Sequence, residues 1–164
     1  MNRLFIAVVA FALVTCLHPS IAMAQLSEIS VGIDGLDCAT CGATVEKNLQ
    51  SAPGVAAVRL VSTEGVAHIR LKAGAAFVPD KLQAAIEKGG EKVRGFNLQM
   101  CANVDKENGR VFVHAPGAKT QRFAVHGKSQ DVASVAPNTL VCLKAKVVSN
   151  ASPVELDLTE LIHP

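Results

Sequence analysis

Two cysteines, Cys38 and Cys41, are the residues of this chain whose types and spacing point most directly to chemistry. They lie in the stretch VGIDGLDCATCGATVEKNL, residues 31–49, between a strand-like run and an amphipathic helical pattern. Thiolates are soft donors that prefer Cu(I), Zn(II) and heavier relatives, and cysteines at this spacing can turn both sulfurs to one ion. The same spacing also suits a redox couple or a structural disulfide, so the pair alone leaves three chemistries open.

The residues around the pair favour thiolate chemistry. Cys41 falls beside the first turn of the expected helix, where backbone N–H groups and the helix dipole stabilise a thiolate and lower its pKa. Gly35 and Gly42 bracket the loop and give its backbone freedom, and Leu36 is the expected apolar anchor to the core. A metal site or a reactive thiol pair therefore fits the local sequence.

The first half of the chain alternates strand and helix patterns. Period-2 alternation indicates strands, and apolar residues three or four apart indicate helices. Glycine and proline separate the runs. The expected order is strand 28–34, helix 42–52, strands 55–62 and 65–71, helix 80–88 and strand 92–98. This order is the ferredoxin-like βαββαβ plan.

After residue 98 the helical pattern disappears, and short β-type runs follow at 99–104, 110–115, 122–127, 139–148 and 154–162. Turn-forming stretches separate them, which is typical of a small all-β domain, a barrel or a sandwich. The last run also fits a short helix. We therefore expect an α+β chain with a ferredoxin-like domain at 25–98 and an all-β domain at 99–164, although a strand running through the boundary would also fit.

Cys101 and Cys142 lie in two of these β-type runs, each on the more polar face. A disulfide between them is the favoured interpretation, and a second thiol site that receives or relays metal is the alternative. His114 and His126 end two adjacent runs, but their spacing matches no ligand motif, so both are expected to be structural.

The first 24 residues have the pattern of an export signal: Arg3, an apolar run at 4–14, and small residues before a cleavage site at Ala24–Gln25. Lipidation at Cys16 and an uncleaved anchor are the alternatives. Removing this segment from the 164 residues leaves 140 with a net charge of about +1, which gives no electrostatic footprint for nucleic acid. We expect a periplasmic or secreted protein whose mature form does not span a membrane.

The sequence pattern that bears on function extends well beyond the cysteine pair. The loop GLDCATCGATVEKNLQSAPGV, the hairpin VAAVRLVSTEGVAHIRL and the helix KLQAAIEKGGEKV closely resemble the heavy-metal-associated domain. That family includes metallochaperones, metal-binding repeats of P-type ATPases and a periplasmic mercuric-ion-binding protein. The resemblance covers residues 28–98 and implies soft-metal binding by Cys38 and Cys41.

Two departures from the family pattern concern which metal is bound. Asp37 makes the motif DCxxC, which resembles members that handle zinc, cadmium and lead, where the carboxylate can join the two sulfurs; a solvated or capping role is the alternative. Glu91 stands where copper-handling relatives tend to carry Lys or an aromatic residue, and its negative charge would favour a divalent cation. An exposed turn residue is the alternative. The resemblance therefore implies one soft ion per chain, with Zn(II), Cd(II) or Hg(II) favoured and Cu(I) the alternative.

The expected function is capture, transfer or sequestration of a thiophilic ion, without enzymatic activity. Its partners would be a metal-donating or metal-accepting protein, including a membrane metal transporter. A periplasmic thiol–disulfide oxidoreductase remains an alternative, because CxxC at a helix start also lowers a thiol pKa in such enzymes. A protein-interaction module with a structural Cys38–Cys41 disulfide is a further alternative.

Overall fold

The computed structural model describes residues 26–36, 38–116, 121–127 and 132–162. The signal segment expected at residues 1–24, including Cys16, lies outside this part of the chain. Within the described ranges, no helix is both long enough and apolar enough to cross a membrane. The elements in chain order are β1 (Leu26–Asp34), α2 (Ala39–Gln50), β2 (Val55–Val61), the 3-10 turn η1 (Ser62–Glu64), β3 (Val66–Leu71), α3 (Pro79–Glu87), β4 (Lys92–Glu107), β5 (Arg110–His114), β6 (Arg122–Gly127), β7 (Leu140–Ser149) and β8 (Val154–Ile162).

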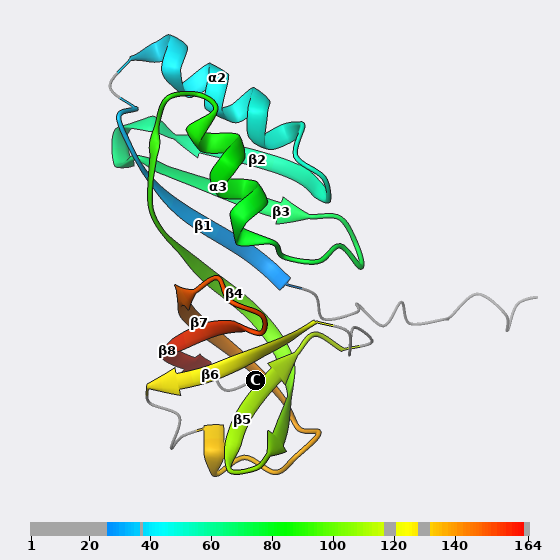
Figure 1. Cartoon of the computed structure of the whole chain (residues 1–164). Helices are drawn as coiled ribbons and strands as arrows, with labels where there is room; N and C mark the ends of the chain where they lie inside the picture. The colour runs from blue at the N-terminus through cyan, green and yellow to red at the C-terminus, as the bar shows by residue number, and fades with distance from the viewer. Residues whose placement is uncertain (1–25, 37, 117–120, 128–131, 163–164) are drawn as a thin grey trace, which may run out of the picture.

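The N-terminal half is an antiparallel sheet of order β2-β3-β1-β4 with α2 and α3 on one face (Figure 1). Alternation along β1 places Ile29, Val31 and Ile33 on the covered face, each at most 2% exposed. Val45 and Leu49, four positions apart on α2, are fully buried above them, as a helical stripe requires. The βαββαβ order expected from the sequence is therefore confirmed.

Strand β4 is common to both halves of the molecule. It pairs with β1 through residues 92–100, with β7 through 97–103 and with β5 through 103–107. The two strands expected at 92–98 and 99–104 are one strand, because the apolar alternation continues without a break. Phe96, Leu98, Met100, Ala102 and Val104 are all buried. The domain boundary expected after residue 98 thus falls inside a continuous strand.

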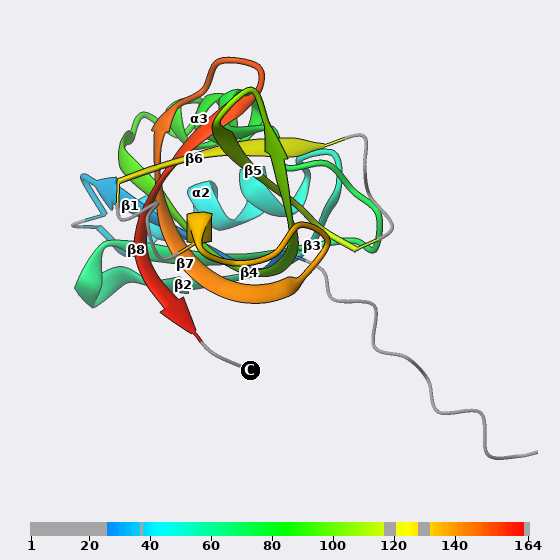
Figure 2. The same cartoon turned by 90° about the horizontal axis from the view of Figure 1, so that it is seen from below.

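The C-terminal half is a closed barrel of five strands. Around the ring β4 pairs with β5, β5 with β6, β6 with β8, β8 with β7, and β7 again with β4. Figure 2, seen from below, shows the strands curving round this ring. Among the strand pairs that the structure describes, only β6 and β8 run parallel, and such five-stranded Greek-key barrels include the OB folds. The all-β expectation is confirmed as a barrel, and residues 154–162 form strand β8, so the alternative of a short helix was wrong.

The loop between β3 and α3 packs against the barrel. Phe77 is 1% exposed, and its ring lies edge-on to Phe96 at a centroid distance of 5.8 Å and 6.4 Å from the ring of Phe123 on β6. The side chain of Asn150, after β7, donates to Asp80 at the start of α3 over 2.8 Å. The two halves therefore share core side chains as well as a strand.

Candidate metal centre

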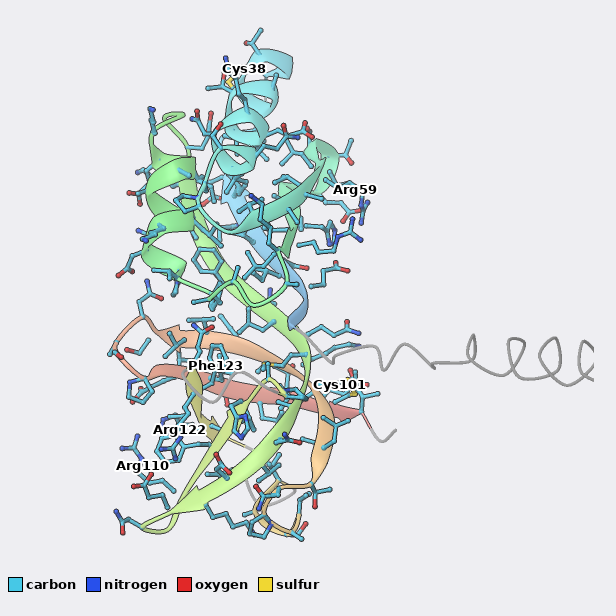
Figure 3. All side chains as sticks on the ribbon, turned by 90° about the vertical axis from the view of Figure 1, so that its right-hand side faces the viewer. Cys38, Arg59, Cys101, Arg110, Arg122 and Phe123 are labelled. Carbon is cyan, nitrogen blue, oxygen red and sulfur yellow. A yellow bond between two sulfur atoms is a disulfide. The ribbon has the colours of Figure 1, made fainter. Side chains whose placement is uncertain are left out.

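Cys38 and Cys41 lie at the N-terminus of α2, at the end of the molecule away from the barrel (Figure 3). Cys38 is the N-cap residue, with extended backbone angles, and its Sγ accepts a hydrogen bond from the backbone N–H of Cys41 over 3.0 Å. Cys38 is exposed and Cys41 is half-buried. A sulfur at this position stands in the positive field of the helix end, which favours a thiolate once the residue is reduced.

In this structure the two sulfurs are joined as a disulfide, with the Cα atoms 5.2 Å apart. The threonine hydroxyl of Thr40 lies 3.2 Å from the Cys38 sulfur. Because both side chains already turn to the same side of the loop, their reduction yields two neighbouring thiols. Metal–thiolate bonds are about 2.3 Å long, so one ion can contact both sulfurs with little change in the backbone.

The loop is positioned by contacts on both of its sides. Leu36 is 7% exposed and anchors the loop to the core, as expected from the sequence. Gly35 has φ of 94°, in the left-handed region that favours glycine, and a side chain there would collide with the carboxylate of Glu91. A Cβ at Gly42 would lie 3.0 Å from the Leu60 side chain, so glycine allows α2 to lie close to β2.

Glu91 is not an exposed turn residue. It is 8% exposed, and its carboxylate packs against the backbone of Gly35, three positions before Cys38. The glycine pair that ends α3 turns the chain back toward the loop, which brings this side chain inward. The sequence placed Glu91 in a turn, but the burial depends on a contact with a residue 56 positions away and has no local signal.

Asp37, the third ligand suggested by the sequence, lies outside the described residues. Within the described ranges, no three His, Cys, Asp or Glu side chains are grouped so that they can hold a metal ion. The donor set described at the loop is therefore the two sulfurs of Cys38 and Cys41. Two thiolates alone suit a soft ion of low coordination number better than a hard one.

Cys101 and Cys142 lie in the barrel and are register partners on β4 and β7. The structure joins them as a disulfide, with a Cα–Cα distance of 3.9 Å, and both are half-buried. Figure 3 shows Cys101 in the half of the molecule away from Cys38. In this oxidised form the two sulfurs of the barrel pair are bonded to each other and offer no thiolate.

Each histidine among the described residues lies beside a carboxylate partner. His68 pairs with Glu28 across β3 and β1. His114 is 3% exposed, and its Nε2 lies 3.3 Å from a carboxylate oxygen of Asp105. His126, at the other end of the β5–β6 pair, lies 3.6 Å from Glu155. His114 and His126 do not converge, which agrees with the structural roles expected for them.

The fold and the cysteine loop together define a domain class. Residues 30–92 match the family model of the heavy-metal-associated domain. This stretch, from β1 to the start of β4, is a heavy-metal-associated domain and confirms the resemblance seen in the sequence.

Several known proteins are similar to part of this chain. A copper-exporting P-type ATPase of Bacillus subtilis (strain 168) is 32% identical in an alignment of 89 residues, and the match covers 49% of this chain and 11% of the ATPase. The N-terminal domain of a potential copper-translocating P-type ATPase from Bacillus subtilis, solved in the Cu(I)-loaded state, is 26% identical, with a TM-score of 0.38. That match covers 42% of this chain and 85% of the solved one. The CopZ metallochaperone is 24% identical over 41% of this chain and 98% of its own, with a TM-score of 0.38.

Proposed function

We propose that this protein is an exported carrier of a thiophilic metal ion, which it captures through Cys38 and Cys41 and passes to another protein or sequesters. The observation that carries the proposal is the cysteine pair at the exposed N-terminus of α2, inside a heavy-metal-associated domain. Export rests on the signal pattern at residues 1–24. N-terminal sequencing of protein from its native compartment tests it, with Gln25 as the expected first residue.

Capture requires the reduced loop. Reduction of the Cys38–Cys41 disulfide by an external dithiol gives two thiols while the dithiol is oxidised to a disulfide. The metal then displaces the protons of the two loop thiols. Transfer needs no redox step, because a thiolate of the partner enters the metal's coordination sphere while one of the carrier's sulfurs leaves. An exposed Cys38 allows this stepwise exchange. The acceptor would be a protein with a similar thiol pair, including a membrane metal transporter.

Two thiolates suit Cu(I), and the copper-exporting ATPase that is similar to this chain points to the same ion. Zn(II), Cd(II) or Hg(II), favoured by the DCxxC motif, would use Asp37 as a third donor. The variant Asp37→Ala separates these cases. A divalent carrier loses Zn(II) affinity in this variant, whereas a Cu(I) carrier keeps its Cu(I) affinity.

Metal analysis with thiol counting on the reduced mature chain tests the binding function. We expect about one ion per chain, bound with the two thiols of the loop. The double variant Cys38→Ser/Cys41→Ser should bind none, and Cys101→Ser/Cys142→Ser, the matched control, should keep full stoichiometry. Full stoichiometry in the loop variant would show that the site lies elsewhere.

One observation favours a second candidate, a thiol–disulfide oxidoreductase. The loop sulfurs form a disulfide at a helix N-terminus, where the Cys38 sulfur accepts the N–H of Cys41. Catalysis of insulin reduction well above the rate of free dithiol would support this function. A rate equal to that of free dithiol, together with bound metal in the reduced chain, would leave the carrier as the function.

A further inference from the structure

A cavity of about 720 Å³ lies at the junction of the two halves, away from the cysteine loop. Its walls come from the start of α3 and the loop before it, from β5 and β6, and from the β7–β8 loop. This volume is within the range of small-molecule sites, which is about 300–1,000 Å³. The proposed metal function makes no use of this cavity, which is called the groove below.

Two arginines, Arg110 and Arg122, line the groove. Figure 3 shows them on one flank of the barrel. The guanidinium carbon of Arg122 lies over the ring of Phe112, 4.3 Å from its centroid, and that of Arg110 lies 5.5 Å away. Phe112 is 9% exposed, since these side chains cover it. Stacking on an aromatic face restricts a guanidinium, so the two cations are held in place before any ligand arrives.

Much of the hydrogen-bonding capacity of these arginines is unused within the described residues. A guanidinium offers five N–H donors. Arg122 meets Glu107 at 2.9 Å, but its Nε is buried without a partner. The contact between Arg110 and Glu155 is 3.9 Å, which is too long for a hydrogen bond. Because that Nε is sealed from solvent, the donors left for a ligand are the terminal N–H groups of the two guanidinium groups.

Two of the other polar side chains of the groove, Gln121 and Asn150, are already paired, and Asp80 and Ser152 also line it. The amide of Gln121 bonds to the backbone of Phe77, and the amide of Asn150 bonds to Asp80. The groove therefore offers a ligand positive charge and N–H donors from two guanidinium groups, beside an apolar wall. One carboxylate, Asp80, also lines it and is bonded to Asn150. Planar guanidinium groups match the oxygens of carboxylates and phosphates, which accept two parallel hydrogen bonds.

We propose that this groove binds a small organic anion whose carboxylate or phosphate oxygens are received by Arg110 and Arg122. A nucleic-acid strand fits the charges less well, because Glu107 and Glu155 flank the arginines and the mature chain has a net charge of only about +1. The site is independent of the metal loop. It would give the barrel a ligand of its own.

Calorimetric titration of the mature chain with citrate, a tricarboxylate, and with pyrophosphate tests the proposal. Both probes chelate metals, so the titrations use the Cys38→Ser/Cys41→Ser background in metal-free buffer. We expect at least one probe to bind at about one per chain, with the preferred probe identifying carboxylate or phosphate as the ligand group. Arg110→Gln and Arg122→Gln should each weaken binding by about tenfold or more. Arg122→Lys, which keeps the charge but loses the planar fork, should also weaken it.

Arg59→Gln is the matched control, because Arg59 is an exposed arginine on β2 in the other half of the molecule. It should bind the probe like the parent. Circular dichroism establishes whether each variant is folded. If Arg122→Gln is unfolded, the affinity of Arg110→Gln for the probe tests the proposal. Three results would overturn the proposal: no binding of either probe at about 10 mM, an equal loss in Arg59→Gln, or tight binding of a single-stranded oligonucleotide in place of both probes.

Discussion

The side-chain amide of Gln121 forms two hydrogen bonds with the backbone of Phe77. Its Oε1 accepts from the Phe77 N–H over 2.8 Å, and its Nε2 donates to the Phe77 carbonyl over 2.6 Å. One side chain immediately before β6 thus satisfies both backbone groups of a buried residue in the loop before α3. The metal-binding half and the barrel are joined here by polar contacts as well as by apolar packing.

Gln121→Ala should lower the free energy of unfolding by about 1–3 kcal/mol, because it leaves the partly buried N–H and C=O of Phe77 without partners. Urea denaturation measures this loss. Gln50→Ala is the control, since Gln50 is exposed at the end of α2 and its side chain bonds to Glu46 one turn away. Its effect should stay within about 0.5 kcal/mol. Equal effects of the two substitutions would show that the Phe77 backbone does not depend on Gln121.

Phe77→Ala should cost about 3–5 kcal/mol, the range for a buried phenylalanine truncated in a packed core. The cavity would open between Phe96 and Phe123, which belong to the two different halves. We therefore expect both halves to unfold in one transition in the parent and in the variant. Hydrogen exchange that reports β2 and β6 separately checks this. Loss of protection in β6 alone would contradict a shared core.

Removal of the barrel disulfide should destabilise the protein without affecting the metal site. Cys101 and Cys142 are 41 positions apart, and a crosslink closing a loop of this length contributes about 2–4 kcal/mol. The variant Cys101→Ala/Cys142→Ala should show this loss in urea denaturation while binding metal like the parent. An altered metal affinity would indicate that the barrel pair takes part in metal handling, as the alternative of a second thiol site requires.

The sequence predicts the N-terminal half in detail because its signals are local. The alternation of Ile29, Val31 and Ile33 and the helical spacing of Val45 and Leu49 each specify an element and its buried face. The hairpin turn after β2 follows from Gly65, whose φ of 61° is in the left-handed region. Closure of the barrel is not local: the parallel pairing of β6 with β8 joins segments more than 25 residues apart.

The two candidate sites also differ in whether the local sequence reveals them. Cys38, Cys41 and the anchoring Leu36 lie within six residues, so motif and spacing reveal them. Arg110, Arg122 and Phe112 come from two strands, and no motif spacing connects them before β5 and β6 pair. Glu91 shows the limit most clearly, because a charged residue beside a glycine pair indicates an exposed turn, whereas the fold buries it against Gly35.

Gly35→Ala should disturb the metal loop more than Gly74→Ala. Both glycines have positive φ, 94° and 73°, so both substitutions carry a backbone cost of about 1 kcal/mol. Only Gly35 has a neighbour in the way, the Glu91 carboxylate, whereas nothing lies within 4 Å of a Cβ at Gly74. We expect Gly35→Ala to lose about 1–3 kcal/mol more in urea denaturation, as overpacking does, and to bind metal more weakly. Gly74→Ala should keep the parent's affinity.

A double-mutant cycle with Glu91→Ala identifies the cause of that difference. If the carboxylate is what a side chain at position 35 displaces, Gly35→Ala will cost less in the Glu91→Ala background than in the parent. The coupling should be about 0.5–3 kcal/mol, the range for residues in contact. Metal affinity is measured for the parent, the two single variants and the double variant. It shows whether metal binding by the loop is restored when the collision between position 35 and Glu91 is removed. Additive losses would mean that the Gly35 backbone alone, without Glu91, sets the position of the cysteines.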